Sequence, residues 1–188
     1  MKKVDLLQLL VLVCLTVFTS CKKDKKEVPA PHNPNEEELI TTLKLIFTDE
    51  EENESEFIFE DIDGNGVAER LDTIRLSSNK TYHVEIILLD KSKNPVDTIS
   101  HEIEEEGDHH QFFFTAKGVE VTFGYEDEDE NGVPIGLLTK WITGGATTNK
   151  SGKVEVVLKH QDDKPKTGNG NADLGETDIE VDFPVLIQ

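Results

Sequence analysis

The chain has 188 residues, of which 19 are basic and 39 acidic, and its formal net charge is −20. That length gives room for one ordinary domain. A chain this acidic repels nucleic acid and anionic lipid headgroups, and it attracts cations or basic partners. We therefore expect no nucleic-acid partner.

A secretory signal is predicted over residues 1–20. A short basic start precedes an apolar run over residues 6–18, and small residues then lead to Cys21. This order is typical of a signal peptide, and the run is too short to favour a membrane-spanning helix.

The segment FTSC, residues 18–21, resembles the lipobox of bacterial lipoproteins, although Phe18 stands where leucine is usual. In that family, cleavage before the cysteine leaves a lipidated N-terminus, which here would be Cys21. Plain secretion, with Cys21 as a free thiol, is the alternative. Several acyl chains would hold the protein stably on a bilayer.

Residues 21–38 are predicted to be the lipidated cysteine and a flexible tether. Beyond Cys21 the segment is rich in charge and proline and almost lacks core-forming side chains. After cleavage Cys21 is the only cysteine, so the domain has no internal disulfide and depends on its own core.

Residues 39–188 are predicted to form an antiparallel β-sandwich, immunoglobulin-like in architecture, with eight or nine strands. Apolar residues recur with period two, as on the face shared by Leu39, Leu43, Leu45 and Phe47, and Gly, Asn and Pro punctuate the pattern. Pro184 favours an edge position for the last strand. Eight main segments carry the pattern, and two short segments, 57–59 and 71–76, flank the stretch 60–72. The eight are 39–47, 82–89, 99–103, 111–115, 119–125, 137–143, 154–160 and 179–187.

Counting alternate connections between antiparallel strands predicts which loops share an end of the sandwich. The connections near 105–108, 126–135 and 161–175 share one end, which gathers acidic residues and histidines. Those near 91–95, 116–118 and 144–151 share the other. That end collects the lysines Lys91, Lys93, Lys117, Lys150 and Lys153.

The stretch EDIDGNGVAERLD, residues 60–72, partly matches a calcium-binding loop. Oxygen ligands stand at alternate positions, and Gly66 falls where such a loop turns sharply. The last position carries Asp where Glu is usual, and strands flank the loop, so an ordinary polar turn is the favoured alternative. The candidate Ca²⁺ ligands are Asp61, Asp63, Asn65, Glu69 and Asp72.

A second candidate site takes a transition metal. By alternation His110 points with Phe112, and His160 points with Leu158. Both histidines fall at the acidic end, so Asp127 and Asp129 complete a possible ligand set. The alternative is a pair of strand-end histidines whose ring nitrogens bond backbone carbonyls.

Catalytic motifs do not occur in the sequence. There is no G-x-S-x-G, no H-E-x-x-H and no glycine-rich phosphate loop. Carboxylates occur throughout the chain, so their pairing identifies no acid–base site. We therefore expect that the protein is not an enzyme.

Five segments together resemble a family of small, largely uncharacterised envelope lipoproteins of Bacteroidota. They are residues 36–42, 63–66, 104–113, 131–137 and 175–181, and the most specific block is EEEGDHHQFFF at 104–114. Members are often labelled type 1 periplasmic binding fold proteins, an α/β fold that the period-two pattern here does not predict. The resemblance implies association with outer-membrane TonB-dependent receptors, which import metals and metal complexes, and draws attention to His110 and Gln111.

We therefore expect a non-enzymatic cell-envelope lipoprotein, in the outer membrane and anchored at Cys21. Its domain would bind a ligand or a cation, as an accessory to a TonB-dependent importer. The alternative is a structural or adhesive surface module whose acidic loops bind Ca²⁺ only for stability. A hydrolase that uses dispersed carboxylates ranks last.

Overall fold

The computed structural model describes residues 39–147, 152–161, 166 and 172–188. The predicted signal peptide, Cys21, the tether and Lys150 lie outside these residues. Within the described residues the chain forms ten strands and one short helix. No helix in this part of the chain combines the length and the apolar character needed to cross a membrane.

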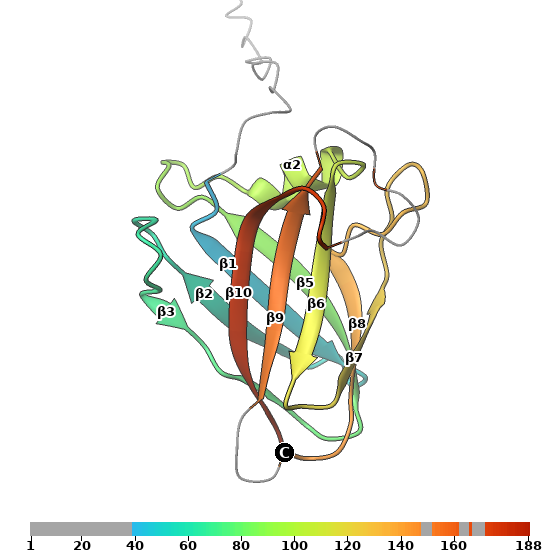
Figure 1. The fold of residues 1–188 in the computed structure, drawn as a ribbon. Coiled ribbons are helices and arrows are strands. Elements are labelled where there is room, and N and C mark those ends of the chain that lie inside the picture. Colours follow the sequence, from blue (N-terminus) through green and yellow to red (C-terminus); the bar gives the residue numbers. More distant parts are fainter. Residues whose placement is uncertain (1–38, 148–151, 162–165, 167–171) are drawn as a thin grey trace, which may run out of the picture. The chain divides into compact units, whose positions relative to one another are not determined.

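Two sheets build the domain (Figure 1). The larger sheet is antiparallel throughout and has six strands in the order β3-β2-β1-β5-β8-β7. Its strands are β1 (Thr42–Asp49), β2 (Glu54–Glu60), β3 (Arg70–Leu71), β5 (Thr81–Leu89), β7 (Val121–Tyr125) and β8 (Leu138–Thr143).

The smaller sheet has four strands in the order β4-β10-β9-β6. They are β4 (Ile74–Leu76), β6 (His110–Lys117), β9 (Gly152–His160) and β10 (Glu176–Ile187). β4 and β10 run parallel, and the other neighbours are antiparallel.

The core lies between the sheets and follows the period-two pattern. Leu43, Leu45 and Phe47 of β1 are fully buried, and the ring of Phe47 meets the edge of Trp141 at a centroid distance of 5.1 Å. The inner faces of β6, β9 and β10 supply the opposing layer. The prediction of an all-β sandwich is confirmed, with ten strands instead of eight or nine. Among the described residues the core runs from Leu43 to Ile187, so the domain carries a hydrophobic core of its own, as a unit that can fold alone requires.

One predicted strand is wrong. Residues 99–103 belong to the helix α2 (Ile99–Glu105), which buries Ile99 and Ile103 and exposes His101. Ile99 and Ile103 are four residues apart, a spacing that fits one face of a helix as well as one face of a strand.

This helix changes the predicted polarity of the sandwich. Residues 91–95 and 105–108 both belong to the single connection from β5 to β6, so Lys91 and Lys93 lie at the acidic end. Lys91 pairs with Glu60, and Lys93 pairs with Asp97 at 2.8 Å. Of the five predicted lysines, two among the described residues lie at the other end. Lys117 of β6 and Lys153 of β9 stand opposite each other there in the strand register.

Two smaller expectations also fail. Leu39 precedes β1 and is 52% exposed, so it does not share the buried face of Leu43. β10 lies inside its sheet, between β4 and β9. Pro184 is tolerated there because β4 pairs with β10 only from Val185 onward, so its missing N–H breaks no bond to β4.

Candidate functional site

Three connections meet at one end of the sandwich, which we call the acidic end. They are residues 90–109 between β5 and β6, residues 126–137 between β7 and β8, and the turn from β9 to β10. Backbone hydrogen bonds join them: Phe112 N–H donates to Ile135 O at 2.7 Å, and Gln161 N–H donates to His109 O at 2.9 Å. The loop count predicted this grouping.

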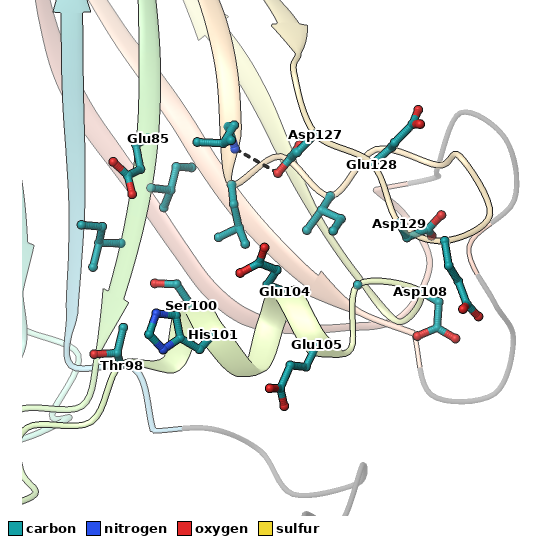
Figure 2. Close-up of a pocket in the computed structure, with 17 residues that line it drawn as sticks. Glu85, Thr98, Ser100, His101, Glu104, Glu105, Asp108, Asp127, Glu128 and Asp129 are labelled. Atoms are coloured by element: carbon teal, nitrogen blue, oxygen red, sulfur yellow. Dashed lines mark hydrogen bonds between the residues drawn. The ribbon is translucent and has the colours of Figure 1, made fainter.

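A cleft of about 680 Å³ opens at the acidic end, between β5, α2 and the loop 126–137 (Figure 2). Its apolar wall comes from Ile86 of β5 and from Ile135 and Leu137 of the loop, all of them buried in the domain. α2 forms the opposite wall because Ile99 and Ile103 fix it on the core, which leaves Ser100, His101 and Glu104 in the cleft lining.

Carboxylates dominate the lining of this cleft. Eight of the lining side chains are acidic, one is histidine, and none of the described lining residues is lysine or arginine. In Figure 2 the acidic groups come from β5, from α2 and its C-terminal turn, and from the loop 126–137. They are Glu85, Glu104, Glu105, Asp108, Asp127, Glu128, Asp129 and Glu130.

Two of these carboxylates hold the loop 126–137 in shape. Asp127 accepts hydrogen bonds from the N–H groups of Gly136 and Leu138, at 2.7 and 2.9 Å. Asp129 accepts from the N–H groups of Asn131 and Val133, at 2.8 and 2.9 Å. Both carboxylates therefore bind backbone N–H groups, and the bond between Asp129 and Asn131, two residues apart, is that of an Asx turn.

Lys166 fixes the same loop from the other side. Its ammonium group donates to Pro134 O at 2.8 Å and lies 3.3 Å from a carboxylate oxygen of Asp129. Both side chains are almost fully buried. Burial lowers the pKa of Lys166, although Asp129 opposes this shift. Burial alone would raise the pKa of Asp129, but the N–H groups of Val133 and Asn131, together with Lys166, lower it overall.

The structure brings the two predicted histidines together. His110 and His160 are direct partners in the register of β6 and β9, and their ring centroids lie 4.2 Å apart. Both side chains are buried, and burial, with His160 nearby, lowers the pKa of His110 to about 4.

The carboxylate beside these histidines is not one of those the sequence suggested. Asp178 joins them, and each of the three residues offers a ligand atom within 4.8 Å of the others. Asp127 and Asp129 do not belong to this group, because their oxygens bind the backbone of the loop 126–137 and Lys166. Strict alternation along β10 points Asp178 outward, so the period-two pattern does not predict that it joins the histidines.

The stretch 60–72 lies at the same end, between β2 and β3. Asp61, Asp63 and Glu69 offer carboxylate oxygens within 4.8 Å of one another, so three of the five predicted Ca²⁺ ligands are gathered. Both oxygens of Asp61 also accept backbone N–H groups, from Asn65 at 3.1 Å and Gly66 at 2.8 Å. Such bonds are typical of a polar turn.

The other two predicted ligands have different partners. The side-chain amide of Asn65 donates to Asp63 at 2.9 Å, and its oxygen accepts the N–H of Val67 at 2.8 Å. Asp72 accepts from the Arg70 guanidinium at 2.7 Å and from the N–H of Ile58 at 3.0 Å. Asp72 therefore belongs to the strand pairing and not to the loop.

No family model, no curated protein and no solved structure matches this chain. A function is therefore inferred from the residues and their geometry.

Proposed function

We propose that the protein is a non-enzymatic, lipid-anchored protein of the cell envelope that binds a cationic ligand in its acidic cleft. The observation that carries this proposal is the lining of the cleft, which holds eight carboxylates and no lysine or arginine among the described lining residues; of the eight, Asp129 is paired from behind by Lys166. Like charges gathered around one cavity raise the local concentration of counter-ions and favour a cation there.

The cleft also selects for size and shape. Its volume of about 680 Å³ is that of a small-molecule site, far larger than a bare metal ion requires. Ile86, Ile135 and Leu137 provide apolar surface beside the carboxylates. An organic cation with ammonium groups on an aliphatic stem, such as a polyamine, matches both features.

The cellular setting of this proposal comes from the sequence. The lipobox resemblance at residues 18–21 supports a lipid anchor on Cys21 and a place in the outer membrane. The family resemblance supports a role as accessory to a TonB-dependent importer, to which the domain would deliver its ligand. Replacing Cys21 by serine tests the anchor: the protein should leave the membrane fraction and lose the mass of its acyl chains.

Calorimetric titration of the domain from Asn33 onward with spermidine tests the cleft. We expect one site whose affinity falls as salt rises, because the contacts are between charges. Glu104 and Glu105 are exposed lining residues. Each Glu→Gln change there should remove up to about 1 kcal/mol, or about fivefold in affinity.

The matched control changes the same charge elsewhere. Glu176 and Glu180 are exposed on β10 and do not line the cleft. The double variant Glu176→Gln, Glu180→Gln should bind spermidine as the unmodified domain does. Equal losses in this control and in the double variant Glu104→Gln, Glu105→Gln would mean that spermidine binds the net charge and not the cleft, and the proposal would fail.

A second candidate function is a structural or adhesive surface module in which Ca²⁺ stiffens a loop. The grouping of Asp61, Asp63 and Glu69 favours it. Calcium at about 100 times its dissociation constant would add about 2.7 kcal/mol of stability. Thermal melts with and without Ca²⁺ test this, since the shift should vanish in Asp63→Ala. A melt that Ca²⁺ does not move eliminates this candidate.

A further inference from the structure

The start of β10 contains an irregularity that turns one carboxylate inward. Thr177 pairs with Lys159 and Ile179 pairs with Leu158, so Asp178 is an extra residue in this strand. Such a bulge redirects a side chain, and bulges are common beside functional sites. The side chain of Asp178 is 3% exposed, whereas Glu180, at a regular outward position, is exposed.

Gly175 makes this local path possible. Its φ is +80°, and a Cβ at this position would lie 2.1 Å from the carbonyl oxygen of His160. The backbone before the bulge therefore passes against the end of β9, which brings Asp178 beside the histidine of that strand. Only glycine adopts this conformation without strain.

The hydrogen bonding of His110 fixes which of its ring nitrogens carries the proton. Nδ1 lies 3.1 Å from the carbonyl oxygen of Glu106, which can only accept, so Nδ1 donates. In the neutral ring the lone pair is then on Nε2. That atom is fully buried and has no hydrogen-bond partner among the described residues.

Nε2 of His110 faces a second acceptor. A carboxylate oxygen of Asp178 lies 3.9 Å away, and the ring centroid of His160 lies 4.2 Å from that of His110. A lone pair and a carboxylate this close in a buried place repel each other, and a cation bound between them removes the repulsion. A histidine that binds a metal through one nitrogen usually donates the other N–H to a carbonyl or carboxylate, as His110 does.

We propose that His110, His160 and Asp178 form a binding site for a divalent transition metal ion such as Zn²⁺. Two imidazoles and one carboxylate are a donor set for Zn²⁺ or Fe²⁺, and Ca²⁺ prefers oxygen ligands alone. Three protein ligands leave a coordination position for water or for another small ligand.

The site has to contract to hold the ion. Bonds of about 2.1 Å in a tetrahedral site place ligand atoms about 3.4 Å apart. The distance from His110 Nε2 to an Asp178 oxygen is 3.9 Å, and the three ligand atoms lie within 4.8 Å of one another, so movements of less than about 1 Å by each side chain bring them to that separation. None of the three residues lines the acidic cleft, so this proposal stands apart from the binding of a cationic ligand there.

Calorimetric titration with Zn²⁺ tests the site, on the domain from Asn33 onward after chelation and dialysis. Excess Ca²⁺ in the buffer saturates the exposed carboxylates. We expect one Zn²⁺ per domain. Asp178→Asn preserves the shape of the side chain and removes the charge, and it should weaken binding by more than about tenfold, the smallest loss typical of outer-shell partners. His110→Gln should do the same.

His83→Ala and Asp182→Asn are the matched controls, because both residues are exposed and lie outside the group and outside the cleft lining. They should leave Zn²⁺ binding unchanged. Absence of stoichiometric Zn²⁺ binding would overturn the proposal, and so would binding that Asp178→Asn leaves intact.

Discussion

Replacing Lys166 by methionine tests how the loop 126–137 is held. Methionine keeps most of the length and apolar volume of lysine and removes the ammonium group. The change leaves the Asp129 carboxylate buried without its cation, 3.3 Å from where the ammonium was, and removes the donor to Pro134 O. The side chains of Lys166 and Asp129 are 0% and 2% exposed, so water cannot replace the lost partner.

The expected cost follows from this burial. Removing one partner of a buried ion pair costs about 3–5 kcal/mol, because an uncompensated charge remains. For a domain of this size that lowers the melting temperature by about 6–20 °C. An exposed pair would cost no more than about 1 kcal/mol.

Chemical denaturation of the parent domain, of Lys166→Met and of Lys166→Met with Asp129→Asn measures this cost. The asparagine oxygen can still accept the N–H groups of Asn131 and Val133 that Asp129 binds. The double variant should therefore recover most of the loss and retain about 1 kcal/mol for the bond to Pro134 O. A loss below about 1 kcal/mol in the single variant, or no recovery in the double variant, would refute the account of this loop.

Three further predictions concern the His110 region and the core. Gly175→Ala should cost about 1–3 kcal/mol in denaturant unfolding, because alanine is strained at a φ of +80° and its Cβ meets His160 O; a neutral effect would contradict the close approach described here. Without metal, the free energy of unfolding should fall as pH drops from 6.5 towards 4, by an amount on the order of 3 kcal/mol, because only the unfolded state protonates His110 in that window. Comparison with His110→Gln isolates this contribution. A parent domain whose free energy of unfolding falls as pH rises through the same window would contradict the prediction. Phe47→Ala removes a fully buried ring that meets Trp141 and should cost about 3–5 kcal/mol in the same assay, whereas a cost below 1 kcal/mol would show that Phe47 is not a core residue.

The sheets could be predicted from the sequence because their burial is periodic. Leu43, Leu45 and Phe47 alternate with less buried residues along β1, and this alternation predicts which face of the strand packs in the core. α2 could not be distinguished in this way. A five-residue segment with isoleucines at its two ends fits either period, and the exposure of His101 between them is known only from the structure.

The candidate sites could be predicted only in part. His110 and His160 were placed together by counting strands, because register pairs residues at the ends of neighbouring antiparallel strands. Asp178 could not be found, since a bulge shifts its side chain to the other face and leaves no mark in the hydrophobic pattern. The acidic cleft depends on how α2 packs against β5. This contact could not be predicted, because the sequence pattern indicates a strand over residues 99–103, where α2 forms.

Amide chemical-shift mapping with spermidine on the ¹⁵N-labelled domain is the most direct test of the proposed cationic-ligand site. If spermidine binds in the cleft, we expect saturable amide shifts concentrated at Glu85, at Glu104 and Glu105 of α2, and in the loop 126–137. Residues on the outward face of β10, such as Glu180, should not move. Shifts spread evenly over the acidic surface, or an absence of saturable shifts, would contradict the claim that the cleft is the binding site.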